Sequence, residues 1–525
     1  MKNKLYISIL SILNILVSFI LIIQVFVFRD LIDKAISKSS ITTDIIIVIS
    51  LITTLLILRF IFLLIRNKYS LKLEVYLKGE IFKNLMKKKF SEISNIHSAE
   101  LSNIYLTDVK NILEARCYAI PTIASCISRI IFAFIAIINL NYMIIIILMA
   151  LGLIVFVISV FYGRYVKKLN KKALKADDNL NSYMQESLEN IRLLKTLSTD
   201  NVLNLNLDQR LKENYIAKNK RNNIQVFASI FLTSLSIVLY ALTLCYSAYL
   251  IYKGKISYGT LTALVSLVSY FESPITSLAS LANKIYSYHA STDRINELYQ
   301  KADEESQIEL NDFDSISIKD LSFSYDNQKV IFNNFNYEIN KNDIIYIKGK
   351  SGKGKTTLIN ILLGFYPYSG NITIKSNNES IKLSEKTRNL FSYVPQENII
   401  FSGTIKSNFK MFYPNIKDDE IINSLEMVNL YSEIKDFGGV DYEIFERGRG
   451  LSIGQIQRLL VAIALASNKP IIIMDEFTSA LDTENENIIV DLITKLNKTI
   501  ILVSHRTLNI ENAKVIDLGG NNEDN

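Results

Sequence analysis

The sequence contains few of the residues that bend, stiffen or cross-link a chain. Its 525 residues include 3 Cys, 6 Pro, 18 Gly and no Trp. Three cysteines without metal-ligand spacing exclude a disulfide framework and a cysteine-based metal site. The low Pro and Gly content excludes collagen-like and Pro/Gly-rich low-complexity chains. We interpret Cys117, Cys126 and Cys245 as small apolar residues, because they lie in or beside apolar segments.

The chain also lacks a strong excess of either charge. It has 58 Lys and Arg against 51 Asp and Glu, for a formal net charge of +7, while 49% of its residues are hydrophobic. A mean hydropathy of +0.21 at this length disfavours a purely soluble protein. Because cytoplasmic loops of membrane proteins are basic in any case, the weak positive charge does not indicate nucleic-acid binding, and we expect no nucleic-acid partner.

Long apolar runs are abundant, and they concentrate before residue 290. A helix needs about 20 apolar residues to cross the hydrocarbon core of a bilayer. Six segments meet this requirement, at residues 5–28, 44–65, 118–140, 142–162, 225–252 and 260–285. We therefore predict an all-α transmembrane domain of six helices over residues 1–290, surrounded by the lipid bilayer.

The two longest connections between these runs are Asn67–Cys117 and Tyr165–Ile224. They carry most of the loop Lys and Arg residues, which places them in the cytoplasm together with both termini. In Leu71–Phe90 and Leu174–Leu197 apolar residues recur at helical spacing. This spacing predicts long cytoplasmic helical extensions, with amphipathic helices on the lipid surface as the alternative. We predict a multi-pass integral protein of the cell membrane.

The composition changes after residue 290. Residues 291–310 are typical of a charged connector, and residues 311–525 form a second predicted domain, which is cytoplasmic. There, short apolar runs alternate with helical segments, as in an α/β domain. The predicted strands are Ser315–Ile318, Asp343–Ile347, Leu390–Val394, Ile471–Met474 and Thr499–Val503.

The segment Gly349–Thr356 fits the pattern G-x-x-x-x-G-K-[ST] between a predicted strand and a predicted helix, Thr356–Leu363. Glycines let backbone N–H groups face an anion, and the helix N-terminus adds positive potential. We predict a nucleotide phosphate site, although this pattern alone also fits a Gly/Lys-rich turn. The candidate residues are Gly349, Ser351, Gly352, Gly354, Lys355, Thr356 and Thr357.

Two carboxylates, Asp475 and Glu476, end the apolar strand that begins at Ile471. Asp475 would hold Mg²⁺ through water, and Glu476 would polarise an attacking water as a general base. In the loop, Lys355 would reach the β- and γ-phosphates and the Thr356 hydroxyl would bind Mg²⁺. Taken alone, two acids at a strand end also fit a solvated turn.

The segment Leu451-Ser452-Ile453-Gly454-Gln455-Ile456-Gln457-Arg458 lies about 20 residues before this strand end. It resembles the LSGGQ signature of ATP-binding cassette (ABC) transporters. The order of all these features resembles an exporter-type half-transporter, in which the membrane domain precedes the cassette. The resemblance covers nearly the whole chain. It implies an α/β P-loop nucleotide-binding domain with a helical subdomain, and ATP and Mg²⁺ as cofactors.

The resemblance also implies roles for single residues. Tyr325 would stack on adenine, Gln396 would contact Mg²⁺ or the attacking water, and His505 would hydrogen-bond the γ-phosphate. The residues of the signature and the D-loop that would contact ATP are Ser452, Gly454, Gln455 and Asp482. The implied catalytic residues are Glu476, His505 and Gln396, and the implied Mg²⁺ ligands are Thr356, Gln396 and Asp475.

At three positions that depart from the family pattern, a large residue replaces a small one. Ile453 and Phe445 replace glycine, in the signature and before the exporter-specific Glu446-Arg447-Gly448, and Phe477 replaces the usual alanine after the catalytic glutamate. Ile453 adds bulk but removes neither the Ser452 hydroxyl nor the Gly454 amide, so we expect it to be tolerated.

One chain supplies one phosphate-binding loop and one signature, whereas the family's composite sites need two of each. The resemblance therefore implies pairing with a second half-transporter, a homodimer being the default. It implies ATP-driven export of a peptide, lipid or hydrophobic small molecule by alternating access. The alternatives are import of a metal-chelate and a non-transporting, nucleotide-gated regulator. Arg129 and Glu272 lie at mid-span, and they form a buried pair or line the substrate cavity.

Overall fold

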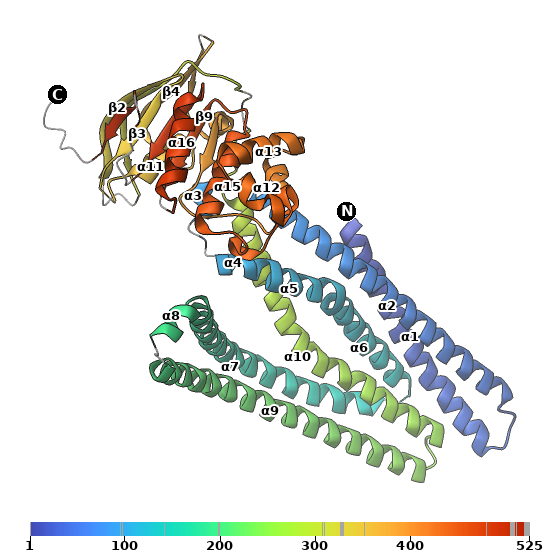
Figure 1. Cartoon of the computed structure of the whole chain (residues 1–525). Helices are drawn as coiled ribbons and strands as arrows, with labels where there is room; N and C mark the ends of the chain where they lie inside the picture. Colours follow the sequence, from blue (N-terminus) through green and yellow to red (C-terminus); the bar gives the residue numbers. More distant parts are fainter. Residues whose placement is uncertain are drawn as a thin grey trace. The chain divides into compact units, whose positions relative to one another are not determined.

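The computed structural model in Figure 1 divides into two compact units, described here one by one. The first contains Met1–Lys83 and Ser98–Tyr299, and the second contains Asn84–His97 and Gln300–Asn525. The structure describes residues 2–94, 96, 98–140, 142–197, 200–306, 308, 310–325, 330–350, 352–377, 379–478, 480–504, 510 and 512–518.

Helices are the regular secondary structure of the first unit within its described residues. Its α-helices are α1 (Lys2–Ile36), α2 (Thr42–Leu85), α4 (Ser98–Asn103), α5 (Val109–Glu114), α6 (Ile120–Leu140), α7 (Tyr142–Glu189), α8 (Ile191–Thr196), α9 (Asp200–Tyr252) and α10 (Tyr258–Gln300). Two π-helical turns, Ile104–Asp108 and Ala115–Ala119, flank α5.

Four stretches of the described chain are long and apolar enough to cross a membrane, namely Leu5–Ile36, Thr42–Leu85, Glu100–Leu140 and Val202–Tyr252. The remaining two predicted spans fall within α7 and α10, where many side chains lie outside the described set. The 53 residues of α9 correspond to about 80 Å at 1.5 Å per residue, far more than a bilayer core of about 30 Å. The helical class and the long extensions are therefore confirmed.

The extended parts of α7 and α9 run side by side, and α8 joins their far ends (Figure 1). The Asp177 carboxylate of α7 accepts hydrogen bonds from Asn214 Nδ2 at 2.9 Å and from Lys218 of α9. The Arg210 guanidinium lies over the Tyr183 ring, 4.7 Å from its centroid. We call this pair of helices the arm. The predicted connector starts inside α10, which continues unbroken to Gln300, so the boundaries at 290 and 310 stay predictions.

Polar contacts hold α1 against α6 within an apolar interior. The Ser18 and Ser125 hydroxyls are 2.9 Å apart, and Asn14 Nδ2 donates to the Pro121 carbonyl at 3.2 Å. Such hydrogen bonds between helices suit a membrane, where no water competes for them. Nearby, Arg129 Nε is buried without a hydrogen-bond partner among the described residues. The Glu272 side chain lies outside that set, so the predicted Arg129–Glu272 pair stays a prediction.

A buried carboxylate ties the helix α5 region to the end of α10. Asp108 is 1% exposed. It accepts hydrogen bonds from Ser291 Oγ at 2.7 Å and Arg294 Nε at 3.0 Å, while Asn111 Nδ2 donates to Ser291 Oγ at 3.0 Å. A buried charge needs such partners because burial removes its hydration. The π-helical turn that ends at Asp108 brings this side chain to α10.

The second unit contains two main sheets. Its strands are β1 (Ser315–Ser324), β2 (Val330–Asn340), β3 (Ile344–Lys348), β4 (Ser369–Ser376), β5 (Glu379–Lys382), β6 (Phe391–Val394), β7 (Gly403–Thr404), β8 (Glu443–Ile444), β9 (Ile471–Asp475), β10 (Thr499–Val503) and β11 (Lys514–Asp517). One sheet is antiparallel in the order β2-β1-β4-β5, and one is parallel in the order β11-β3-β10-β9-β6. The five strands predicted from sequence are all confirmed.

Helices cover both faces of the parallel sheet, which explains why every residue of β9 and β10 is buried. The helices of this unit are α3 (Phe90–Ile93), α11 (Lys355–Leu362), α12 (Ile405–Phe412), α13 (Asp418–Met427), α14 (Tyr431–Ile434), α15 (Ile453–Leu465) and α16 (Thr483–Lys495). One apolar core lies between the two sheets around α11, and the other joins the parallel sheet to α12, α13, α15 and α16.

The segment that contains α3 is part of the second unit, although the residues before and after it in sequence belong to the first. Lys88 Nζ is 2.6 Å from Asp303 and donates to the Lys301 carbonyl at 2.7 Å. The Phe90 ring lies 4.6 Å from the Phe365 ring, centroid to centroid. These contacts explain why Asn84–His97 belongs to the cassette unit.

We expect Arg294→Ala to lower the free energy of unfolding by about 2 kcal/mol. Removing one partner of a fully buried ion pair costs about 3–5 kcal/mol, and the half exposure of Arg294 reduces this. A maleimide dye that reports thermal exposure of the buried Cys117 and Cys126 thiols measures the shift. Lys110→Ala, an exposed change on α5 two residues after Asp108, is the control. Equal shifts for both variants would contradict the role given to Asp108.

Candidate nucleotide site

The parallel sheet brings four loops to one edge. The phosphate-binding loop follows β3, Ser504 follows β10, Asp475 ends β9, and the loop with Gln396 follows β6. These four strands are neighbours, and the carboxyl ends of parallel strands lie at the same edge. Residues separated by more than a hundred positions in sequence therefore meet here.

The phosphate-binding loop has the conformation that its glycines allow. Gly352 and Gly354 have positive φ values of 78° and 95°, and Gly354 is the N-cap of α11. A Cβ atom on Gly354 would lie 2.5 Å from the Ile331 side chain. Lys355 is 6% exposed, and its Nζ donates to the Gly349 carbonyl at 2.8 Å. The ammonium group is thus folded back over the loop, at the N-terminus of α11.

Of the two threonines after Lys355, Thr356 is exposed and Thr357 is buried. Thr357 Oγ1 lies 3.1 Å from the Tyr325 hydroxyl. The Tyr325 ring is edge-on to the rings of Phe323 and Tyr366, at 5.0 and 5.4 Å between centroids, and the residue is 51% exposed. An exposed aromatic face held by two other rings suits stacking of a planar base.

The acidic end of β9 has two distinct environments. Asp475 is fully buried. Glu476 is partly exposed, its carboxylate accepts a hydrogen bond from Gln396 Nε2 at 2.8 Å, and its backbone N–H donates to the Val503 carbonyl at 2.8 Å. Its φ of 51° is unusual for a residue with a side chain. Strained conformations of this kind are typical of functional positions.

Tyr393, on β6 beside this strand, was not predicted. Burial, and then the charge of Asp475, raise the pKa of its phenol above the usual value. Tyr393 therefore stays protonated and neutral beside the carboxylate.

The signature segment forms the N-terminus of α15. Ser452 is the N-cap, and its hydroxyl accepts the Gln455 backbone N–H at 3.2 Å, while Gln455 Oε1 accepts the Ser452 N–H at 2.8 Å. A hydroxyl that accepts one bond still has a proton to donate. Capping and phosphate binding are thus compatible. Gln455 Nε2 also donates to Glu433 at 2.8 Å, and Arg458 pairs with the same carboxylate at 2.7 Å.

The D-loop packs directly on this helix. Gln457 Oε1 accepts the Ala480 N–H at 3.1 Å, and a Cβ atom on Gly454 would lie 2.9 Å from the Ala480 carbonyl oxygen. Asp482 caps α16, and the N–H of Asn485 lowers the pKa of its carboxyl. Gln457 and Arg458 belong to the predicted signature segment, but the sequence assigned neither of them a role, because their contacts are with distant residues.

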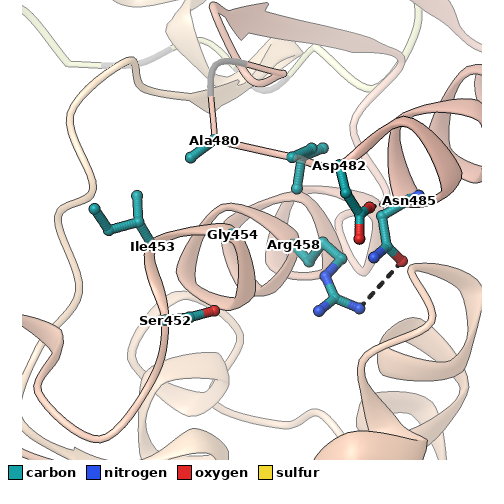
Figure 2. Close-up of a pocket in the computed structure, with 8 residues that line it drawn as sticks. Ser452, Ile453, Gly454, Arg458, Ala480, Asp482 and Asn485 are labelled. Carbon is teal, nitrogen blue, oxygen red and sulfur yellow. Dashed lines mark hydrogen bonds between the residues drawn. The ribbon is translucent and has the colours of Figure 1, made fainter.

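Signature and D-loop together line an open pocket of about 450 Å³ (Figure 2). Figure 2 shows Ser452 and Ile453 at the helix terminus and Asp482 with Asn485 opposite, where Arg458 donates to Asn485 at 3.3 Å. The lining residues are Ser452, Ile453, Gly454, Arg458, Ala480, Leu481, Asp482 and Asn485. None of them belongs to the phosphate-binding loop, so within the described residues the predicted site residues form two separate groups.

The three departures from the family pattern have different surroundings. Ile453 is 57% exposed on the pocket rim, and Phe445 is likewise exposed at 57%. Phe477 is buried in the core with α15. Two predicted site residues, Ser351 and His505, lie outside the described residues.

Comparison with known proteins decides the family. Residues 7–275 match the family model of the ABC transporter transmembrane region, and residues 332–479 match the family model described as ABC transporter. The chain belongs to the ABC transporters. A predicted export ATP-binding/permease protein of Rickettsia felis is 31% identical over 99% of this chain and 92% of its own. A predicted multidrug export protein of Staphylococcus aureus is 31% identical over 68% of this chain and 64% of its own.

A solved structure of a bacterial Atm1-family ABC exporter with ATP bound has the same fold. Its TM-score is 0.85, with 19% identity over 98% of this chain and 93% of that one. By its sequence and fold this chain is thus an exporter-type half-transporter, an ATP-binding permease and a multi-pass integral membrane protein. The predicted family, fold class and ATPase class are confirmed.

We expect Gly454→Ala to lower the ATPase rate about tenfold or more, which corresponds to ~1.4 kcal/mol. The added methyl group would meet the Ala480 carbonyl oxygen, so the D-loop or the helix terminus must move. Phosphate release from the purified transporter in lipid nanodiscs is the measurement. The matched control is Gly79→Ala, where a Cβ atom meets nothing within 4 Å. A Gly454→Ala rate equal to that of the control would show that the close approach is unimportant.

Proposed function

We propose that two copies of this half-transporter bind and hydrolyse MgATP at two composite sites, and that hydrolysis drives export. One observation carries the proposal. Lys355, Asp475, Glu476 and Gln396 share one sheet edge, while Ser452 lies in a separate pocket. Each group is half of the site that the family uses, and a second chain, facing head to tail, supplies the other half.

In the proposed reaction a water molecule attacks the γ-phosphorus, and the bond from this phosphorus to the bridging β–γ oxygen breaks. Glu476 accepts the proton of the water. The Gln396 amide orients the Glu476 carboxylate, as their 2.8 Å hydrogen bond supports. Lys355 neutralises the β- and γ-phosphates. His505 would hydrogen-bond the γ-phosphate, and the glycines of the loop, with Ser351 and Thr357, surround the phosphates.

The residues at the sheet edge fit Mg²⁺. The buried carboxylate of Asp475 and the exposed hydroxyl of Thr356 are hard oxygen ligands, and Gln396 adds an amide oxygen. Mg²⁺ bound with ATP would neutralise charge that develops on the phosphates. Among the described residues no group of three or more acidic, His or Cys side chains suits a metal, which agrees with an ion that arrives with the nucleotide.

The partner's signature would close the site. The Ser452 hydroxyl has a proton left to donate, and the Gly454 backbone N–H lies at the N-terminus of α15, where positive potential favours a phosphate. Gln455 and Asp482 would shape the same surface. Closure over two ATP molecules would pull on the arm and shift the membrane domain between inward- and outward-facing states.

The transported substrate is a peptide, a lipid or a hydrophobic small molecule in this proposal. Names of similar proteins that mention multidrug or lactococcin transport support this range. Import of a metal-chelate and nucleotide-gated regulation without transport are the alternatives. A wild-type chain that binds ATP but never hydrolyses it would favour regulation.

We expect Glu476→Gln to reduce ATP hydrolysis at least ~100-fold, because general bases contribute about 10²–10⁴ in rate. ATP binding, measured by equilibrium dialysis, should remain. The amide keeps the size of the side chain but cannot accept the proton. Glu484→Gln, in the first turn of α16, is the matched control. If Glu476→Gln hydrolysed ATP at the wild-type rate, Glu476 would not be the base.

Mixing two inactive variants tests the homodimer. Lys355→Ala lacks the phosphate-binding lysine, and Ser452→Ala lacks the signature hydroxyl, so we expect each alone to be idle. A mixed dimer keeps one intact composite site, and random pairing restores about a quarter of the wild-type sites. Phosphate release after co-reconstitution measures the recovery. An active wild type without any recovery in the mixture would contradict composite sites.

A further inference from the structure

The arm carries a band of positive charge in which only Lys218 has an ion pair with a described acidic residue, Asp177. Residues 165–176 of α7 and 215–224 of α9 contain Lys and Arg but no Asp or Glu. Five of its lysines, Lys168, Lys171, Lys172, Lys175 and Lys220, are exposed, and within the described residues they have no ion pair. We define the basic belt as Lys168, Lys171, Lys172, Lys220 and Arg221.

Contacts between the two helices show that both halves of the belt lie at one level. Asp177 of α7 binds Asn214 and Lys218 of α9, and the Asn179 carbonyl accepts a hydrogen bond from Arg210 at 3.4 Å. The helices are antiparallel, so residues before Asp177 lie opposite residues after Lys218. Lys172 is therefore level with Arg221, and the five cations lie in one short section of the arm.

This level adjoins the apolar part of both helices. The predicted spans end at residue 162 in α7 and begin at residue 225 in α9. At 1.5 Å per residue the nearest cations of the belt, Lys168 and Arg221, lie about 6–9 Å beyond these runs. The headgroup layer begins at the ends of these apolar runs and is about 5–8 Å thick. The long Lys and Arg side chains of the belt reach toward this layer. Tyr165, 48% exposed, marks the boundary.

Other helices differ at comparable positions. In residues 66–83 of α2 the cations alternate with Glu74 and Glu80, and Lys78 pairs with Glu74 at 2.6 Å. On α10, Lys284 pairs with Glu114 at 3.0 Å. A general preference for cytoplasmic cations accounts for positive charge on all of these helices, but it does not account for a cluster of exposed lysines without ion pairs at one level of the arm.

We propose that the basic belt binds the phosphate groups of anionic phospholipids in the cytoplasmic leaflet. Five cations in one plane attract lipids of net negative charge and leave zwitterionic lipids without preference. The belt thereby holds the membrane-proximal part of the arm at the headgroup layer, while α8 at the far end remains free of the lipid. The inference rests on the membrane location of the chain and is independent of the proposed catalytic roles.

The absence of tryptophan allows a direct test. Tyr165→Trp introduces a single fluorophore beside the belt, and Phe60→Trp introduces one on α2, 62% exposed and away from the belt. The full chain is reconstituted in vesicles with brominated phosphatidylglycerol or brominated phosphatidylcholine, which quench on contact. At Tyr165→Trp we expect the binding constant for phosphatidylglycerol to be about five times that for phosphatidylcholine. At Phe60→Trp we expect the two constants to be about equal.

Neutralising the belt should remove this preference. Lys168→Gln, Lys171→Gln and Lys172→Gln are combined in one variant, and a second, independent variant carries the changes Lys220→Gln and Arg221→Gln. We expect the fivefold preference to fall to about twofold or less in each variant. In the parent the preference should weaken at 1 M salt, because the Debye length there is about 3 Å. The control variant carries Lys319→Gln, Lys375→Gln and Lys410→Gln on the cassette, which matches the change in net charge of the first belt variant, and it should keep the preference.

Three results would overturn the proposal. The first is an equal preference at the two reporter positions, which means that the lysines serve topology only. The second is a preference that survives in both belt variants. The third is displacement of brominated phosphatidylglycerol by inorganic phosphate but not by chloride at equal ionic strength, which means that a soluble phosphate compound, and not a lipid, is the occupant.

Discussion

The alignment of four parallel strands at one edge is the constraint on which the nucleotide site depends. β3, β10, β9 and β6 are hydrogen-bonded neighbours in one register, so their carboxyl ends cannot move independently. The strands are buried on both faces, which makes the edge rigid. Rigidity suits phosphoryl transfer, because positioning and fixed charge supply most of the catalysis.

The signature surface has a different origin. It depends on the N-terminus of α15. Ser452 and Gln455 cap this terminus, and the ion pair of Arg458 with Glu433 anchors the helix. The close packing of Gly454 on Ala480 joins this terminus to the D-loop. Movement of either element therefore changes the other, and a partner cassette that docks on the pocket would contact both at once.

Long helices need other means to keep their relative positions. An arm of two helices has little apolar interior of its own, since many of its large apolar side chains are exposed. Besides the buried Leu169, Ala173 and Leu180 of α7, its helices are joined by polar contacts of Asp177 and by Arg210 on the Tyr183 ring. By contrast, the α1–α6 pair has an apolar core with two hydrogen-bonded serines, and Asp108 fastens the next segment to α10. The arm is the less firmly packed part, which suits an element that moves during transport.

Much of this could be predicted from local patterns. Apolar runs of bilayer length, helical spacing in the long loops, and the phosphate-binding and signature segments are properties of neighbouring residues, so they are legible without coordinates. The strand predictions were confirmed for the same reason. The family followed from the order of these motifs, and the comparisons confirmed it.

Contacts between distant residues were decided only by the tertiary structure. The pairing of Gln396 with Glu476 joins loops 80 positions apart, and the close approach of Gly454 to Ala480 depends on how α15 packs. Likewise, the docking of Phe90 on Phe365 could not be inferred from either segment. A sequence determines which segments are helical, apolar or anion-binding, because those properties are local. Which of them touch depends on the packing of the whole chain, because many distant side chains must be buried at once.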